Sequence, residues 1–346
     1  MHARSWLKVA AVAAGGYVVA KRLLPPSYSF ADKVVIVTGG SRGLGLELSR
    51  RLADAGAHLA ICARDPEELA AAAEELSDRG RGDVFAGPCD VTDRGQVADF
   101  VRAVVGRFGR VDVLINNAGV IEVGPMEEIT EEDYDRALAT HLYGPLYFVE
   151  AVLPAMKRRR AGRIANIASI GGRISVPHLL SYTASKFALV GWSEGLGVEL
   201  AREGIRVTTV CPGLMRTGSP FNASFKGQHR KEFAWFAGLG SLPVLSIDSG
   251  TAADRILDAV ARGKREYIFP VLWKTVVTAH DLFRNTSLFV SENMNRLYPG
   301  PGGIGTGRRL GWESESAFTR SPVTALNRAA ARRNNETPVG NGEGPR

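Results

Sequence analysis

Short apolar runs alternate with longer helical patterns through most of this chain of 346 residues. The first run, Val34 to Val37, is β-branched throughout, as is typical of a strand buried on both faces of a sheet. Six further runs follow, at residues 58–62, 84–86, 113–115, 164–167, 207–210 and 267–269. Helical patterns lie between them, at residues 45–55, 66–77, 95–108, 131–156, 182–202 and 250–261. Strands and helices that alternate with short connections predict right-handed crossovers, and therefore an α/β fold with one doubly wound parallel sheet of about seven strands.

The alternation predicts one catalytic domain at residues 30–270, with its ligand site beyond the carboxyl ends of the strands. Residues 271–298 carry a helical pattern with large apolar side chains, and we expect a helical extension that packs on the domain or contacts a membrane. From Pro299 onward the chain is rich in Gly, Arg, Asn and Glu. Residues 299–346 are therefore predicted to be a disordered tail, apart from a weak helical pattern at 323–333.

Residues 1–29 precede the domain and contain an uninterrupted run of apolar or small residues at 9–20, with basic residues on both sides. A spanning helix usually needs about 18–20 apolar residues, so this run is short. A secretory signal peptide, a short membrane anchor or interfacial helix, and a helix packed on the domain are the competing interpretations. Trp6 and Tyr17 suit a membrane interface, so the anchor is favoured and a cytoplasmic, membrane-associated protein is predicted.

The charge and cysteine content exclude several classes of function. The net charge is +7, but the basic clusters are short and no aromatic residues interleave them, so we expect no nucleic-acid binding. Attraction to anionic lipid is the better interpretation of the positive charge. Cys62, Cys89 and Cys211 each close an apolar run, which indicates small buried side chains in a reducing compartment. We expect no metal site.

A glycine-rich turn follows the first strand and opens the first helix of the domain. Gly39, Gly43 and Gly45 have the spacing Gly-x-x-x-Gly-x-Gly, which differs from the commoner Gly-x-Gly-x-x-Gly fingerprint. Glycine allows the backbone to approach a pyrophosphate, and the N-terminus of a helix favours its negative charge. The turn therefore predicts a dinucleotide site.

Three polar residues further along the chain have the chemistry of proton transfer. Tyr182 and Lys186 are four residues apart and share one face of a predicted helix, and Ser169 precedes them by 13 residues. A serine hydroxyl can polarise a carbonyl, and a tyrosine hydroxyl can deliver a proton. Free tyrosine titrates near pH 10, so we expect the neighbouring ammonium to lower that pKa.

Together with Asp90-Val91, Asn116-Asn117-Ala118-Gly119 and Pro212-Gly213, these motifs occur in the order and spacing of the short-chain dehydrogenase/reductase superfamily. The resemblance covers residues 32–217, and more loosely extends to 270. It implies a Rossmann fold, an NAD(P) cofactor and Ser-Tyr-Lys catalysis. The cofactor-binding residues that it implies, with the side chains of the turn, are Gly39, Ser41, Arg42, Gly43, Leu44, Gly45, Arg64, Asp90, Val91, Asn117, Ala118, Gly119, Tyr182, Lys186, Pro212, Gly213 and Thr217.

The resemblance also implies individual roles. Tyr182 would be the general acid in reduction or the base in oxidation, Lys186 would hold the nicotinamide ribose, and Ser169 would bond the reacting oxygen. Asp90 would accept a hydrogen bond from the adenine amine. The segment from Pro212 to Thr217 would close over the nicotinamide carboxamide.

The residues after the second strand predict the choice of cofactor. NAD-preferring relatives carry Asp at the position of Ala63, where it bonds the ribose 2′-hydroxyl and repels a 2′-phosphate. Arg64 follows, and Arg42 lies inside the glycine turn. Two arginines can clamp a 2′-phosphate, so NADP(H) is favoured over NAD(H), although Asp65 beside Arg64 counts against this.

One residue departs from the superfamily pattern: relatives usually have Asn where His141 stands. That Asn holds a water that leads to the active-site lysine. An imidazole can also donate and accept hydrogen bonds, so His141 is a candidate relay residue.

The segment between Ser219 and Ser246 corresponds to the superfamily's variable lid over the substrate. Its large apolar residues indicate either a greasy pocket or packing of the lid on the domain; they are Phe221, Phe225, Phe233, Trp235, Phe236, Leu239 and Leu242.

The function expected from these features is NADP(H)-dependent interconversion of a carbonyl and an alcohol on a small apolar substrate such as a lipid, steroid or retinoid. The alternative is a non-catalytic NADP-binding regulator, which the intact Ser-Tyr-Lys set disfavours. A sugar-nucleotide epimerase fits the glycine spacing less well. Membrane contact through the N-terminal segment and homo-oligomerisation are both compatible with the sequence.

Overall fold

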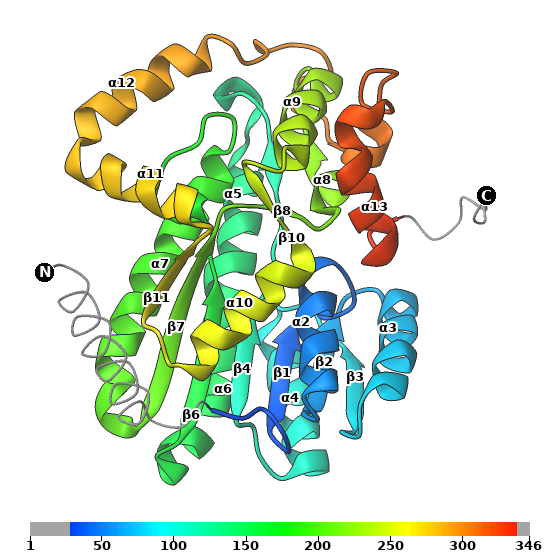
Figure 1. The fold of residues 1–346 in the computed structure, drawn as a ribbon, viewed down its shortest axis with the longest axis vertical. Coiled ribbons are helices and arrows are strands. Elements are labelled where there is room, and N and C mark those ends of the chain that lie inside the picture. Colours follow the sequence, from blue (N-terminus) through cyan, green and yellow to red (C-terminus); the bar gives the residue numbers. More distant parts are fainter. Residues whose placement is uncertain (1–27, 338–346) are drawn as a thin grey trace, which may run out of the picture.

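The computed structural model describes residues 28–337 and contains one seven-stranded parallel sheet, in the order β11-β7-β6-β4-β1-β2-β3 (Figure 1). The strands of this sheet are β1 (Val34–Thr38), β2 (His58–Ala63), β3 (Val84–Pro88), β4 (Val113–Asn116), β6 (Gly162–Ile167), β7 (Ile205–Pro212) and β11 (Glu266–Phe269). The predicted doubly wound α/β fold is confirmed, and all seven predicted runs are strands. The strand order reverses between β1 and β4, where such sheets bind their ligands.

Helices cover both faces of the sheet. One face carries α2 (Gly43–Asp54), α3 (Pro66–Arg79) and α10 (Ser249–Ala261). The other carries α4 (Arg94–Phe108), α5 (Glu131–Leu138), α6 (Gly144–Arg159) and α7 (Leu180–Leu200). The long helix predicted at 131–156 is divided by a π-helical turn, η2 (Ala139–Tyr143), where the Gly144 N–H donates to the Ala139 carbonyl. That turn carries His141.

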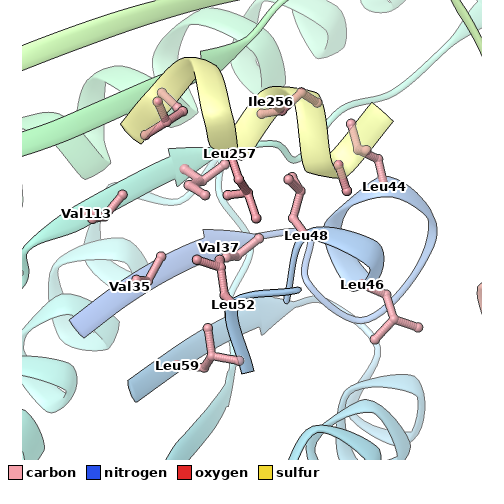
Figure 2. Packing of buried hydrophobic residues seen from close by; sticks show 14 of the residues in the cluster. Val35, Val37, Leu44, Leu46, Leu48, Leu52, Leu59, Val113, Ile256 and Leu257 are labelled. Atoms are coloured by element: carbon pink, nitrogen blue, oxygen red, sulfur yellow. The ribbon is translucent and has the colours of Figure 1, made fainter. Parts of the chain in front are cut away.

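The core lies on both sides of β1. Val35 and Val37 point to one face and Val34 and Ile36 to the other, and none is more than 3% exposed. Figure 2 shows Val35 and Val37 among side chains of α2 and α10, which include Leu48, Leu52 and Leu257. Burial of each such side chain contributes roughly 1.5–3 kcal/mol. The glycine turn is therefore fixed on a rigid strand.

Smaller elements build the lid. They are β5 (Glu122–Val123), β8 (Leu214–Arg216), α8 (Ser219–Asn222), β9 (Ser224–Phe225), α9 (His229–Ser241) and β10 (Ser246–Asp248). Within residues 28–337, five short 3₁₀ turns lie at Met126–Glu128, Ile170–Gly172, Ala201–Glu203, Gly311–Ser314 and Pro322–Thr324.

In the lid, Phe225 and Phe233 are fully buried against each other, with ring centroids 5.4 Å apart. None of the seven large apolar residues of the lid lines the cavity described below, so these side chains mainly pack the lid.

Two helices form an arm after β11. They are α11 (Val271–Leu282) and α12 (Arg284–Asn295), which confirm the helical pattern predicted for 271–298. In Figure 1 the arm extends away from the sheet, and no residue of α12 is buried. Leu282, Phe283 and Phe289 are each at least 65% exposed.

The prediction of a disordered tail from Pro299 is wrong for residues 299–337. This segment forms β12 (Arg309–Leu310), which pairs with β9, and α13 (Ala325–Arg333), which lies beside α8 and α9 (Figure 1). Most of its buried side chains are polar, and Thr319, Asn327 and Asn334 are 0% exposed. The prediction from composition failed because this segment is stabilised mainly by hydrogen bonds and not by the burial of apolar side chains.

The predicted N-terminal anchor lies outside the described residues, as do residues 338–346. Within residues 28–337, no helix combines the length and apolar character needed to cross a membrane.

Candidate active site

A cavity of about 610 Å³ lies at the carboxyl ends of the central strands. Most of the predicted site residues line it, from both halves of the sheet: Gly39, Ser41, Arg42, Gly43, Leu44, Arg64, Asp90, Val91, Asn117, Ala118, Gly119, His141, Tyr182, Lys186 and Thr217. Residues up to 178 positions apart in sequence therefore share one site.

The glycine turn has the conformation that a phosphate cradle requires. Gly39 and Gly43 have φ values of +64° and +57°, which side chains rarely adopt. A Cβ on Gly45 would lie 1.9 Å from the Gly39 carbonyl oxygen, so Gly45 is required for packing, and it does not line the cavity. The N-terminus of α2 has no capping side chain and no acidic residue in its first turn. These backbone N–H groups can receive the pyrophosphate of a dinucleotide.

Thr38 fastens the turn to the end of β4. Its hydroxyl accepts hydrogen bonds from the backbone N–H groups of Asn117 (2.9 Å) and Ala118 (3.0 Å). The Asn117 side chain in turn donates to the Thr38 carbonyl at 3.0 Å. Thr38 was not singled out from the sequence as a site residue, although it lies in the motif.

Tyr182, Lys186 and Ser169 come together at the carboxyl end of β6. The Lys186 Nζ donates to the Ile167 carbonyl at 2.9 Å and lies 5.7 Å from the centre of the Tyr182 ring. Ser169 is hydrogen-bonded to Tyr182, and its own Oγ accepts from the Gly171 N–H at 3.0 Å. A Cβ on Gly171 would lie 3.1 Å from the Tyr182 ring, so a larger residue there would press on the phenol.

Burial governs the ionisation of this trio. It raises the pKa of Tyr182, and the hydrogen bond with Ser169 opposes it by less. It also lowers the pKa of Lys186 to about 7. The surrounding protein therefore raises the tyrosine pKa instead of lowering it, because desolvation outweighs the hydrogen bond with Ser169. Tyr182 carries its proton at neutral pH and is ready to donate it.

His141 is 1% exposed, and both of its ring nitrogens have protein partners. Nε2 accepts from the Val120 N–H at 3.1 Å, so Nδ1 carries the proton and donates to the Ser185 Oγ at 2.8 Å. Ser185 donates to the Tyr182 carbonyl at 2.8 Å. Burial, and then the Lys186 charge, lower the pKa of His141 well below its usual value. A neutral imidazole with both nitrogens engaged has no site left for a relay water.

The residues predicted to select the cofactor lie at the rim of the cavity. Arg64 is exposed, and none of the ion pairs formed within residues 28–337 involves it. Arg42 pairs with Glu68 at 3.1 Å. The Asp65 Oδ1 accepts from the backbone N–H groups of Glu67 and Glu68, so Asp65 caps α3.

The structure does not bring Pro212 and Gly213 into the cavity. Both are buried, and a Cβ on Gly213 would lie 2.0 Å from the Trp273 ring of α11. The Trp273 Nε1 donates to the Leu245 carbonyl at 2.8 Å, which fixes the ring there. Of the segment expected over the carboxamide, Thr217 lines the cavity.

Glu336 is among the charged residues of the cavity that sequence reasoning missed, together with Glu68 and Arg136. Glu336 is 5% exposed and lies beside Gly43, and burial raises its pKa to about 7. No pattern marks it, because it follows a short polar helix in a segment that reads as disordered.

Comparisons with known proteins agree with this geometry. The family model for short chain dehydrogenases matches residues 33–225. The chain belongs to the short-chain dehydrogenase family. It is 45% identical over 190 residues to the granaticin polyketide synthase putative ketoacyl reductase 1 of Streptomyces violaceoruber, covering 54% of this chain and 69% of the relative. It is 42% identical over 241 residues to a putative ketoacyl reductase of Streptomyces coelicolor, covering 69% and 86%.

A solved short-chain dehydrogenase from Streptomyces avermitilis has the same fold. It superposes with a TM-score of 0.65 and 32% identity, over 77% of this chain and 98% of the other. Short-chain dehydrogenases are oxidoreductases that act with a nicotinamide dinucleotide on carbonyl or alcohol groups. The glycine cradle and the uncapped N-terminus of α2 fit such a cofactor.

Proposed function

We propose that this short-chain dehydrogenase is an NADP(H)-dependent enzyme that interconverts a carbonyl and an alcohol on an apolar substrate. One observation carries the proposal. Tyr182 and Lys186 line the cavity that also contains the glycine turn, and Ser169 is bonded to Tyr182. A proton donor and a dinucleotide cradle therefore share one space.

The roles follow from the contacts of each side chain. When bound, the nicotinamide supplies or accepts the hydride. The Tyr182 hydroxyl gives its proton to the carbonyl oxygen in reduction, and Ser169 bonds the same oxygen and orients it. Lys186, fixed by the Ile167 carbonyl, favours charge on the phenol once the proton has left. Burial keeps the Tyr182 proton in place at neutral pH, which suits a proton donor in the reducing direction.

The cofactor preference rests on Arg64 and Arg42. The Asp65 carboxylate accepts two hydrogen bonds from the N-terminus of α3, which offsets part of its repulsion of a 2′-phosphate. Arg64 is exposed at the rim of the cavity, where its guanidinium can pair with that phosphate. Arg42 is paired with Glu68, so we expect Arg64 to provide most of the preference for NADP(H).

An apolar substrate fits the side chains around Tyr182. Ile121, Ile167 and Met215 line the cavity. Tyr182, Ile121 and Phe236 all pack against the same buried apolar cluster of the lid. The ketoacyl reductases among the relatives are named for a carbonyl on an acyl chain. The lid aromatics contribute indirectly, by holding the lid in place.

We assign His141 a positioning role. Its bonds to Val120 and Ser185 tie the loop after β4 to the first turns of α7, which carry Tyr182. The ring lies edge-on to Tyr182, with centroids 5.5 Å apart. The departure from the usual Asn therefore preserves a link between two walls of the cavity.

Membrane association is part of the proposal. The exposed Leu282, Phe283 and Phe289 of the arm suit an interface, and so does the apolar run at residues 9–20. Deleting residues 1–25 should move the protein from the membrane fraction toward the soluble one while NADPH binding persists. If the full-length protein already fractionates as fully soluble, the membrane-anchor hypothesis is wrong. The chain is also compatible with a homo-oligomer.

The test of function is NADPH consumption by the full-length protein with carbonyls of graded chain length. We expect turnover with long-chain 3-oxoacyl esters and cyclic ketones, and much less with short polar aldehydes. Binding of NADPH without turnover on any carbonyl would instead favour a non-catalytic regulator.

A further inference from the structure

The last described residues of the chain lie on the glycine turn. The C-terminal strap, defined here as residues 325–337, consists of α13 and a four-residue tip, residues 334–337. In Figure 1 the strap, drawn in red, ends above α2 and α3. Nothing in the short-chain dehydrogenase motifs accounts for a segment at this position.

The tip is hydrogen-bonded to backbone groups of the glycine turn, among them an N–H group that an anion would bind. The Gly43 N–H at the start of α2 donates to the Asn334 carbonyl at 2.9 Å, and the Asn335 side chain donates to the Ser41 carbonyl at 3.4 Å. A Cβ on Gly43 would lie 2.3 Å from the Glu336 Oε1. A carbonyl oxygen and a carboxylate thus occupy the uncapped N-terminus of α2, where negative charge is favourable.

Glu336 is held there by specific contacts. It is 95% buried (5% exposed), and Asn222 of α8 donates to both its backbone carbonyl, at 2.9 Å, and its Oε2. A Cβ on Gly218 would lie 2.9 Å from the Glu336 Cβ, so the lid is shaped around this residue. Asn222 and the lid therefore fix the Glu336 side chain in this position.

The body of the strap is anchored separately from its tip. Arg50 of α2 donates to the Arg333 carbonyl at 2.9 Å, and its second bond, to the Asn334 Oδ1 at 3.1 Å, has to break when the tip leaves the turn. Arg333 pairs with Asp248 at 2.9 Å, and Asn327 donates to the Ala237 carbonyl at 3.0 Å. The other bonds let the tip leave the turn while α13 stays in place.

We propose that the tip of the C-terminal strap is an internal competitor of the dinucleotide. The Asn334 carbonyl and the Glu336 carboxylate take the phosphate position at the N-terminus of α2, and the cofactor binds by displacing them. The inference rests on the proposed function, since it takes the glycine turn as the pyrophosphate site. Its consequence is that the apparent affinity for NADP(H) includes the free energy needed to move the tip.

The experiment measures NADPH dissociation constants of three full-length proteins: wild type, Glu336→Gln and Glu313→Gln. Glutamine keeps the size of Glu336 and its contact with Asn222, but it removes the charge that Glu336 carries beside the phosphates above its pKa of about 7, so the titrations are made at pH ~8. We expect Glu336→Gln to bind NADPH on the order of tenfold more tightly. Glu313 is an exposed carboxylate of the same C-terminal segment that does not line the cofactor cavity, so Glu313→Gln should match wild type.

Hydrogen exchange of the wild-type protein gives a second readout. The Glu336 N–H donates to the Ala331 carbonyl at 2.9 Å, so its exchange is slow without nucleotide. Saturating NADPH should speed exchange at residues 335–337 and leave α13 unchanged.

Three results would contradict the competitor. Equal or weaker NADPH binding by Glu336→Gln would overturn it, and so would stronger protection of the tip with NADPH, which would make the tip a cofactor ligand. In both cases the proposed function stands. If none of the three proteins binds NADPH, the proposed function fails and the competitor fails with it.

Discussion

The catalytic wall of the cavity and its glycine turn differ in how the chain builds them. Tyr182, Ser185 and Lys186 lie close together on α7, and their bonds reach Ile167 and His141, which are 19 and 44 residues away in the chain. The glycine turn instead meets a segment almost 300 residues further on, through Asn334 and Glu336. The polar groups of the catalytic wall are hydrogen-bonded to one another, so this wall is preorganised. The glycine turn instead holds the acidic side chain of Glu336 where the phosphates of the dinucleotide would bind.

This comparison predicts that changes in the catalytic wall affect turnover far more than cofactor binding. Tyr182→Phe removes only the proton-carrying oxygen, so turnover should fall by about 10²–10⁴. The NADPH dissociation constant should stay within a few fold. Steady-state kinetics with a nucleotide titration on the same preparation checks both, and near-wild-type turnover would remove Tyr182 from the mechanism.

The next largest effect is expected at His141. His141→Leu leaves the buried Val120 N–H and the Ser185 hydroxyl without the imidazole, at a cost of roughly 1–3 kcal/mol of stability. Turnover should fall with it, and NADPH affinity much less. His141→Asn can accept and donate at the same place and should retain most of both. Urea unfolding and turnover of the two variants test this, and a Leu variant equal to wild type would make His141 ordinary packing.

At the glycine-turn side, Arg64→Ala should weaken NADPH binding by about tenfold or more, with little effect on NADH, because only NADPH carries the 2′-phosphate. Arg102→Ala is the matched control, since Arg102 is exposed, pairs with Asp99 and does not line the cavity. Titration of each protein with both nucleotides decides the matter. Equal losses for NADPH and NADH in the Arg64 variant would contradict the assignment.

The smallest effect is a pH dependence of stability. The pKa of His141 is lowered in the folded protein, so below about pH 6.5 the unfolded chain binds a proton that the folded one does not. The contribution of His141 is therefore fully present above pH 6.5 and is lost as the pH falls. His141→Asn should show a shallower decline between pH 7 and 5 in urea melts. Parallel profiles would mean that this ring does not set the acid sensitivity.

The fold and the catalytic wall were predictable because local patterns encode them. A few consecutive residues are enough to recognise the β-branched run of β1, and the same holds for the four-residue spacing of Tyr182 and Lys186. The partners of His141 were not, since Val120 and Ser185 lie 21 and 44 residues away. The packing of Trp273 on Gly213 likewise joins distant segments.

The strap was missed for a different physical reason. Asn327 and Asn334 are buried through hydrogen bonds to backbone and side-chain groups, and polar residues of that kind read as solvent-exposed in a sequence. Apolar periodicity marks burial only where apolar area supplies the stabilisation.

The central claim is that both walls serve one reaction, the transfer of hydride from the nucleotide to a carbonyl carbon. The most direct measurement uses NADPH that carries deuterium at one face of the nicotinamide C4, together with a ketone that the protein consumes. We predict that the product alcohol carries deuterium on its carbinol carbon with NADPH labelled on one face and not the other, and that Tyr182→Phe slows this transfer without changing the face. Alcohol formed without deuterium from either labelled NADPH, or no alcohol from any carbonyl while NADPH binds, would contradict the account.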